Sequence, residues 1–238
     1  MTPLKRTVRR HAASVAASVP GLRSLHHWEQ TRVRPHLHAY LRDRANRRRH
    51  GPAAPLFGER LWIDPLAIDH AVVHGSSLWD SGRVAYHDFT AGRLDAIEDD
   101  PVLRAAIAHW RDGVPWEESG EVERMEEAIR LKGPIKGCRT RADILARCSR
   151  LDEIFATIQR EGRVRPQAEL DPGVFREAGG IGVHIGPGGA PIRAANGRHR
   201  FAMARILRLR SIPVRIGLVH HSALPMLDDL RRPPGTHG

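Results

Sequence analysis

The chain has 238 residues, of which 41% are hydrophobic, so it can bury the core of one large domain. Its 38 Lys and Arg exceed its 27 Asp and Glu; this excess fits polyanionic partners and equally fits an arginine-rich genome. There is no apolar run of the ~20 residues that span a membrane, no signal-peptide pattern, and only two cysteines without metal-site spacing, so we expect a cytoplasmic protein without disulfides or zinc.

Residues 1–58 are predicted to form a basic helical extension that ends in a linker. Two helical stretches, Val8–Val19 and Trp28–Arg49, carry most of the arginines of this unit. Such an extension can bind nucleic acid, lie on an anionic membrane or pack against the domain as peripheral structure, and the sequence leaves all three open. Gly51–Gly58 is rich in Gly and Pro and is the predicted linker.

The main domain is predicted to span residues 59–222, with Leu61–Ile63 as its first strand and a helical insertion at about 70–131. In the insertion, Pro101–Asp112 has helix-start residues, because aspartates precede a proline in the first turn. Trp116–Leu131 is predicted to be an amphipathic helix. Its charged face consists of six glutamates: Glu117, Glu118, Glu121, Glu123, Glu126 and Glu127.

A basic loop and a long helix follow the insertion. The loop Lys132–Arg139 combines two lysines with two glycines, so Lys136 is a candidate phosphate contact, although the loop lacks the spacing of a P-loop. Asp143–Glu161 has an apolar stripe at helical spacing and is followed by Gly162, a typical residue at the end of a helix.

The stretch Gly182–Gly217 is predicted to form the centre of the domain. Val183–Ile185 and Ile192–Ala195 are short apolar strands on either side of a Gly-Gly turn. Arg198–Leu209 has helical spacing of apolar residues, and Ile212–Ile216 alternates as a further strand. Strands and helices in this order predict an α+β fold with a small mixed sheet.

The start of the helix after Gly197 carries three side chains that can be cationic, Arg198, His199 and Arg200. Cations oppose the helix dipole there, so they are unusual unless an anion lies between them and the free N–H groups. Helix N-termini bind phosphates in this way. The pattern therefore indicates a phosphate site, and the alternative is a solvated basic helix end.

These residues resemble the ParB/sulfiredoxin superfamily. Its Gly-x-His-Arg turn, Ala-rich helix and Ile-Pro-Val strand correspond here to Asn196–Arg200, Ala202–Arg205 and Ile212–Val214. Leu61–Ile68 and Leu151–Pro166 are similar to its opening strand and its preceding helix, in the same order along the chain. A weaker pattern, the Trp-Asp and Gly-x-x-Trp-Glu pairs of the insertion, resembles a subgroup associated with surface-polysaccharide genes.

The resemblance implies that the turn binds the phosphates of a nucleotide, an ATP-type or CTP-type tri- or diphosphate, usually with Mg²⁺. The implied binding residues are Asn196, Gly197, Arg198, His199 and Arg200, with Lys136 as the secondary contact named above. No residue set predicts a dedicated metal site, and Asn196 stands where many relatives carry Asp. Sulfiredoxin chemistry is not expected, because Arg198 replaces the required cysteine.

Three functions stay open at this point. The first is a nucleotide-dependent phosphotransferase or nucleotidase, for which His199, Glu161 and Asp152 are the candidate catalytic residues. The second is a DNA-binding or nuclease-like ParB relative, and the third is a non-catalytic nucleotide-binding scaffold. The second is weakened because residues 223–238, the predicted C-terminal tail with one short helix at Leu224–Arg231, leave little room for a helix-turn-helix region.

Overall fold

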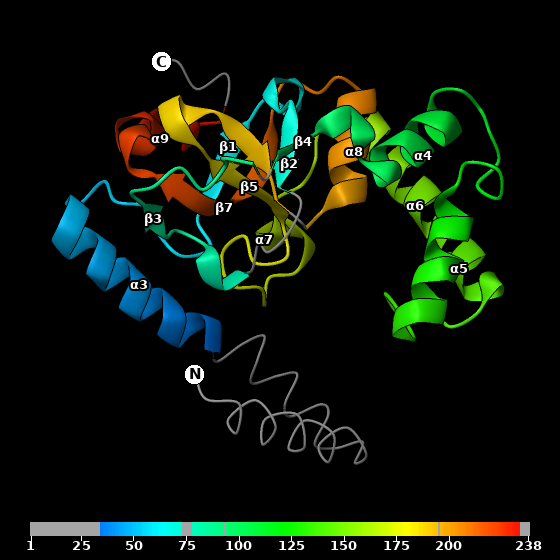
Figure 1. Cartoon of the computed structure of the whole chain (residues 1–238), viewed down its shortest axis with the longest axis horizontal. Coiled ribbons are helices and arrows are strands. Elements are labelled where there is room, and N and C mark those ends of the chain that lie inside the picture. The colour runs from blue at the N-terminus through cyan, green and yellow to red at the C-terminus, as the bar shows by residue number, and fades with distance from the viewer. Residues whose placement is uncertain (1–33, 73–77, 93, 195, 234–238) are drawn as a thin grey trace, which may run out of the picture.

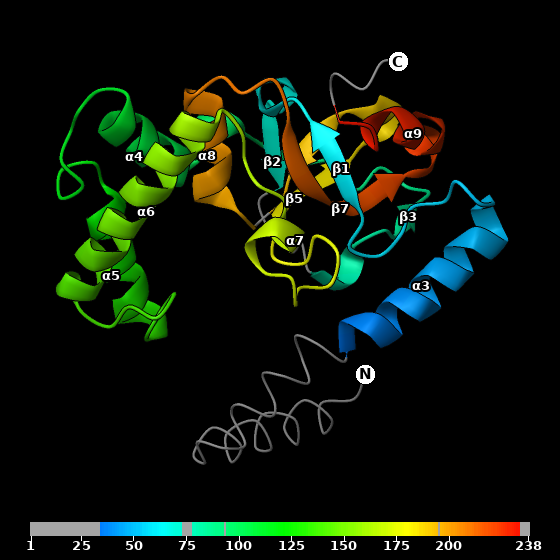
Figure 2. The same cartoon turned by 180° about the vertical axis from the view of Figure 1, so that it is seen from behind.

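The computed structural model describes residues 34–72, 78–92, 94–194 and 196–233. This part of the chain contains seven α-helices and one seven-stranded mixed sheet, so the predicted α+β class is confirmed. Figures 1 and 2 show the sheet in the middle, with α3 at one end and α4, α5 and α6 at the other. The predicted helix Val8–Val19 lies outside the described residues.

The sheet has the strand order β1-β7-β5-β6-β2-β4, and β3 pairs with β7. β7 is parallel to β5 and β3 and antiparallel to β1, and β2 joins β6 in parallel and β4 in antiparallel fashion. The strands are β1 (Arg60–Ile63), β2 (His70–Val72), β3 (Val84–Ala85), β4 (Leu94–Ala96), β5 (Ile181–Ile185), β6 (Pro191–Arg193) and β7 (Ile212–His220).

The centre of the sheet is formed by the stretch that the sequence predicted. β5 and β6 are antiparallel neighbours on either side of a turn at Pro187–Gly189, and β5 pairs directly with β7. Every residue of β5 is buried, as expected for a strand that is covered on both faces. This central pair gives α8 a rigid surface to pack on.

The helices are α3 (Arg34–His50), α4 (Pro101–Trp110), α5 (Glu121–Lys132), α6 (Arg141–Glu161), α7 (Gln167–Leu170), α8 (Arg198–Ile206) and α9 (Leu227–Leu230). Phe201 and Met203 of α8 join Val183 and Ile216 of the sheet in the main apolar core. α4 and α6 pack on α8, and α5 packs on α4 and α6. The helices α4, α5 and α6 thus surround the start of α8.

Local sequence signals explain where these helices begin. The Asp100 side chain accepts a hydrogen bond from Val102 N (2.9 Å), and a proline occupies the first turn of α4. Thr140 and Asp143 form a reciprocal capping box at the start of α6. The long predicted helix is therefore present, and it ends at Gly162 in the left-handed conformation.

Three predicted segments differ from the structure. Among the described residues of the insertion at 70–131, the α-helices begin at residue 101, because the first part supplies β2, β3 and β4 to the sheet and contains two short 3-10 helices. Gly51–Gly58 is packed rather than free, since Phe57 is fully buried. α5 begins at Glu121 instead of Trp116, because Gly120 has a φ of 89° that interrupts a helix.

The short helix predicted at Leu224–Arg231 is present as α9, after a 3-10 helix at His221–Met226. Leu227 of α9 is fully buried, and Arg231 forms an ion pair with Glu59 (2.7 Å) beside β1; residues 234–238 lie outside the described part. Within the described ranges, no helix combines the length and apolar content needed to cross a bilayer.

Candidate functional site

A cavity of about 620 Å³ lies where α5 and α6 face the start of α8. It receives Lys136 from the basic loop and Val102 from α4. All six residues of the predicted phosphate site line it: Asn196, Gly197, Arg198, His199, Arg200 and Lys136. The fold therefore brings Lys136 next to a turn that is 60 residues away in the sequence.

Gly197 sets the position of the helix start. Its φ of 74° favours glycine, and a Cβ atom there would lie 2.7 Å from the Cα atom of Ile181 in β5. The turn can approach the sheet this closely only without a side chain. No side chain caps α8, so N–H groups of its first turn are available to water or to a ligand.

Arg198 forms an ion pair with Asp100, the residue that caps α4. Asp100 also pairs with Arg193 of β6 at 2.7 Å, and the side chains of both partners are at most 6% exposed. Burial alone would raise the pKa of Asp100, but the hydrogen bond from Arg198 and the charge of Arg193 hold this pKa below its usual value. Arg198 thus ties α8 to α4 and to the sheet.

His199 is held by Glu121 of α5. Its Nε2 atom lies 3.0 Å from Oε1 of Glu121, and Arg124 pairs with the same carboxylate at 2.7 Å. Glu121 is fully buried. Burial would raise its pKa, but the hydrogen bonds from His199 and Arg124 lower it overall. The carboxylate is therefore ionised at neutral pH and orients the imidazole toward the cavity wall.

Four further cations of the cavity form no ion pair within 4.0 Å among the described residues, although Glu177 acts on Arg200 from farther away: Lys132, Lys136, Arg147 and Arg200. Arg200 donates a hydrogen bond to the carbonyl oxygen of Gly179 (2.8 Å), and burial lowers its pKa despite the opposing charge of Glu177. The Nε atom of Arg147 is buried without a hydrogen-bond partner. Among the described lining residues, six are Arg or Lys and one is acidic.

The other two candidate catalytic residues lie elsewhere. Asp152 accepts hydrogen bonds from the indole nitrogens of Trp110 (2.8 Å) and Trp116 (3.1 Å), so it holds α4, α6 and the intervening loop together. Glu161 pairs with Arg165 in a neighbouring cavity of about 270 Å³, and the hydrogen bond from Arg165 lowers its pKa. Neither side chain lines the cavity that contains His199.

Glu121 is the carboxylate that the sequence interpretation missed. It was assigned to the solvated face of an amphipathic helix together with five other glutamates. The available signal was Gly120, which starts the helix at Glu121 and turns this side chain toward α8. The partner, His199, is 78 residues away in the sequence, so only the tertiary structure pairs them.

The donor set of the cavity favours anions over metal ions. Its one acidic lining residue, Glu121, is already bonded to a histidine and an arginine. Within the described residues, no group of three or more His, Cys, Asp or Glu is placed to hold a metal. Cys138 and Cys148 are both buried, and burial raises the pKa of Cys148 to about 11, so its thiol is unreactive at neutral pH.

Comparisons with protein-family models, with curated proteins and with solved structures find no match to this chain. The likeness of the α8 region to the ParB/sulfiredoxin superfamily therefore stays a prediction from the sequence motif.

Proposed function

We propose that this protein binds a nucleotide, with the phosphates of the nucleotide in the cavity at the start of α8. The observation that supports the proposal most directly is the excess of cations there. Lys132, Lys136, Arg147 and Arg200 line the cavity around an uncapped helix N-terminus and form no close ion pair within the described part of the chain. Arginine and helix N–H groups together match the charge and the acceptor oxygens of phosphate.

The other wall of the cavity suits the remainder of a nucleotide. Apolar side chains from four elements form this wall: Val102, Met125, Ala128, Ile135, Leu151 and Ile154. A site with one charged and one apolar wall orients a ligand that has the same two parts. The resemblance to the ParB/sulfiredoxin superfamily supports the same assignment.

If the bound nucleotide reacts, His199 is the residue placed to move a proton. Glu121 orients its imidazole as the third member of a catalytic arrangement orients a base. This arrangement fits a phosphotransferase or a nucleotidase, and a scaffold that binds without turnover uses the same cavity. The Mg²⁺ implied by the resemblance does not fit the described residues, because the oxygens of Glu121 are already bonded, so we derive no step through it.

The setting we propose is the cytoplasm, where nucleotides are abundant. The two free, buried thiols of the described residues are consistent with this reducing compartment.

Thermal-shift titration of the full chain tests the proposal. ATP, CTP, GTP and ADP are compared, each with and without Mg²⁺, and adenosine and cytidine serve as ligands without phosphate. We expect at least one nucleotide to raise the melting temperature and both nucleosides to leave it unchanged, because binding to the native state stabilises it. Stabilisation by nucleosides alone, or by none of these ligands, contradicts the proposal.

A pair of variants on α6 locates the binding site. Arg147 lines the cavity, whereas Arg150 is exposed on the same helix. Arg147→Ala is expected to weaken nucleotide affinity by about tenfold, since it removes a charge-assisted hydrogen bond; Arg150→Ala should leave it within about twofold. Equal affinities of the two variants would place the nucleotide elsewhere.

A phosphate-release assay separates an enzyme from a scaffold. An enzyme releases phosphate as the wild type and loses this activity in His199→Ala, whereas a scaffold releases none.

A further inference from the structure

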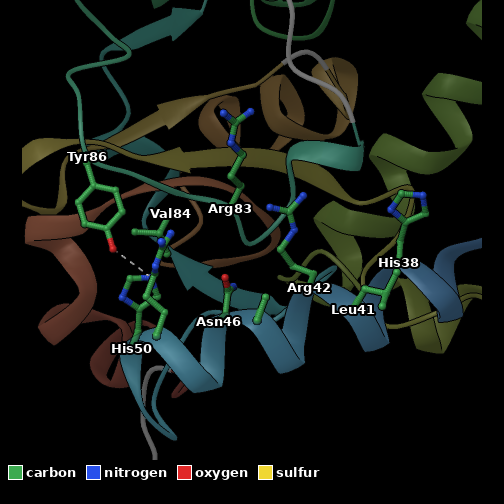
Figure 3. Close-up of a pocket in the computed structure, with 10 residues that line it drawn as sticks. His38, Leu41, Arg42, Asn46, His50, Arg83, Val84 and Tyr86 are labelled. Carbon is green, nitrogen blue, oxygen red and sulfur yellow. Dashed lines mark hydrogen bonds between the residues drawn. The ribbon is translucent and has the colours of Figure 1, made fainter.

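A second basic surface lies at the opposite end of the molecule, between α3 and β3 (Figures 1 and 3). It is a groove of about 510 Å³, with Arg42 and Arg49 on the wall formed by α3 and Arg83 on the wall that leads into β3. Tyr86 lies at one end, near His50. Among the described residues that line the groove, none is acidic.

The cations of the two walls lie close enough to interact. The pKa of Arg42 is lowered by burial and then by the charge of Arg83, with Asp80 opposing this effect. The carboxylate of Asp80, which lies 3.7 Å from the guanidinium of Arg83 and outside the groove lining, compensates part of this repulsion. An anion bound between the two guanidinium groups would relieve it.

α3 is a fixed wall because polar side chains anchor it. Asn46 donates through Nδ2 to the carbonyl oxygens of Pro55 and Gly82, at 2.6 Å each. Asp43 accepts from Phe57 N (2.7 Å) and pairs with Arg176 (2.8 Å). Asn46 and Asp43 are both buried, so this helix is docked without a continuous apolar stripe.

The last turn of α3 is basic and contributes two residues to the lining of the groove. It contains Arg47, Arg48, Arg49 and His50, and the three arginines are exposed. The carboxyl-terminal end of the helix dipole stabilises cations here, but it does not neutralise them. Of these residues, Arg49 and His50 line the groove, whereas Arg47 and Arg48 line a separate cavity together with Asp43.

Aromatic side chains are interleaved with these cations. The Tyr86 ring is 56% exposed, is stacked on His221 at a centroid distance of 5.4 Å, and has the Arg49 guanidinium 6.0 Å from its centroid. An exposed ring supported on its other face is a platform for a planar base. A concave strip of cations with such a platform differs from a flat membrane-binding surface.

We propose that the groove between α3 and β3 binds single-stranded nucleic acid. Arg42, Arg49 and Arg83 contact successive phosphates, and Tyr86 stacks with a base. Cations along a groove together with aromatic stacking are the two features by which proteins bind single strands without reading their sequence. The inference is independent of the nucleotide cavity, because the two sites share no residue.

Fluorescence anisotropy with the full chain and a labelled oligothymidylate of about 20 nucleotides tests this proposal. We expect binding that weakens with salt, with a slope of log K against log salt of about −0.7 for each phosphate contacted. The double variant Arg49→Ala/Arg83→Ala should bind about tenfold more weakly and lose about 1.4 from the magnitude of that slope. Arg42 is left unchanged in this test because its guanidinium also donates to the carbonyl oxygen of Trp79.

The matched control removes the same charge elsewhere. Arg150 and Arg210 are exposed arginines outside the groove, and Arg150→Ala/Arg210→Ala should keep the wild-type affinity within about twofold. Equal losses in the two double variants would show attraction by net charge alone and would overturn the proposal. Tighter binding to the matching duplex, or binding only to vesicles that contain phosphatidylserine, would also overturn it.

A second pair of variants tests stacking. Tyr86→Phe keeps the ring and should bind like the wild type, whereas Tyr86→Ala should bind at least about fivefold more weakly. Equal affinity of Tyr86→Ala and Tyr86→Phe would show that Tyr86 does not stack with a base. Circular dichroism of each variant checks that the fold is intact.

Discussion

The cavity at α8 and the groove at α3 are both lined by arginines, but the chain neutralises them differently. In the cavity, Arg198 and Arg124 pair with the buried carboxylates Asp100 and Glu121. In the groove, the described lining residues include no carboxylate, and the arginines of the last turn of α3 are exposed. Arg83 forms a longer ion pair, at 3.7 Å, with Asp80 outside the lining. Arginine thus forms ion pairs with buried carboxylates at one end of the molecule and a charged surface at the other.

This difference follows from the cost of burial. A charge that leaves water needs an opposite charge and hydrogen bonds close by, whereas an exposed guanidinium is stabilised by water. Arg198 holds α8 against α4, and His199 holds α8 against α5 through the carboxylate that Arg124 also pairs with. The unpaired arginines of the cavity, such as Arg147, are the groups left for a ligand. Substitutions at the two ends should therefore differ in their effect on stability.

The largest effect is expected at Asp100. Asp100→Asn keeps an oxygen that can cap α4 but removes the negative charge between Arg193 and Arg198. Because Arg193 is 5% exposed, its charge would be left buried and unpaired, and we expect a loss of about 3–5 kcal/mol in the free energy of unfolding. Urea denaturation measures this loss.

The control for Asp100→Asn is an ion pair of the same residue types on the surface. Asp112 pairs with Arg111 at 2.8 Å, and both side chains are about half exposed. Asp112→Asn should leave the urea midpoint close to that of the wild type. Similar losses in the two variants would mean that burial does not distinguish the two kinds of arginine.

The fold was predictable where a local pattern determined the element. The capping residues of α4 and the apolar stripe of α6 gave these helices nearly the correct bounds, and Gly-Gly marked the turn between β5 and β6. β2, β3 and β4 were missed because strands of two or three residues are too short for alternation to show. Their pairing partners are far away in the sequence, so only the assembled sheet defines them.

The site was predictable only in part for a similar reason. The turn at Gly197 was recognisable from the cations at a helix start. Lys136, predicted as a secondary contact, lines the same cavity. The choice of carboxylates was less successful: Asp152 binds two indoles, and Glu121 was not distinguished from its neighbours. Which glutamate of an amphipathic helix is buried depends on the helix that packs against it, here α8.

An intermediate effect is expected where α3 is anchored. Asn46→Ala removes the donor that satisfies the buried carbonyl oxygens of Pro55 and Gly82. We expect a loss of about 2–3 kcal/mol in the free energy of unfolding, since an unsatisfied buried acceptor costs about 1–3 kcal/mol. Arg48→Ala, at an exposed position of the same helix, should change stability by less than about 0.5 kcal/mol. A large effect of Arg48→Ala would mean that the exposed arginines also hold α3.

The smallest effect, and the one that depends on pH, is expected at Glu121. Its folded-state pKa lies below the ordinary value of 4.5, because the hydrogen bonds from His199 and Arg124 outweigh burial. As the pH falls below about 4.5, the unfolded chain binds a proton at this residue before the folded chain does. The stability that Glu121 contributes is therefore present above that pH and is lost as the pH falls through the folded-state pKa.

Glu121→Gln removes this titration together with the charge. At about pH 6.5 the variant should be about 1–2 kcal/mol less stable than the wild type, as expected for hydrogen bonds to a charged group, and the difference should narrow by about pH 3. Urea denaturation midpoints of both proteins at several pH values measure this stability difference. Glu126→Gln is the control on the same helix, because Glu126 is 41% exposed and pairs with Arg141 at the surface; its difference from the wild type should be small at every pH. If the difference in the free energy of unfolding between Glu121→Gln and the wild type stayed constant in acid, the carboxylate beside His199 would not behave as a buried, paired charge. The contrast between the cavity at α8 and the groove at α3 would then be wrong for the cavity.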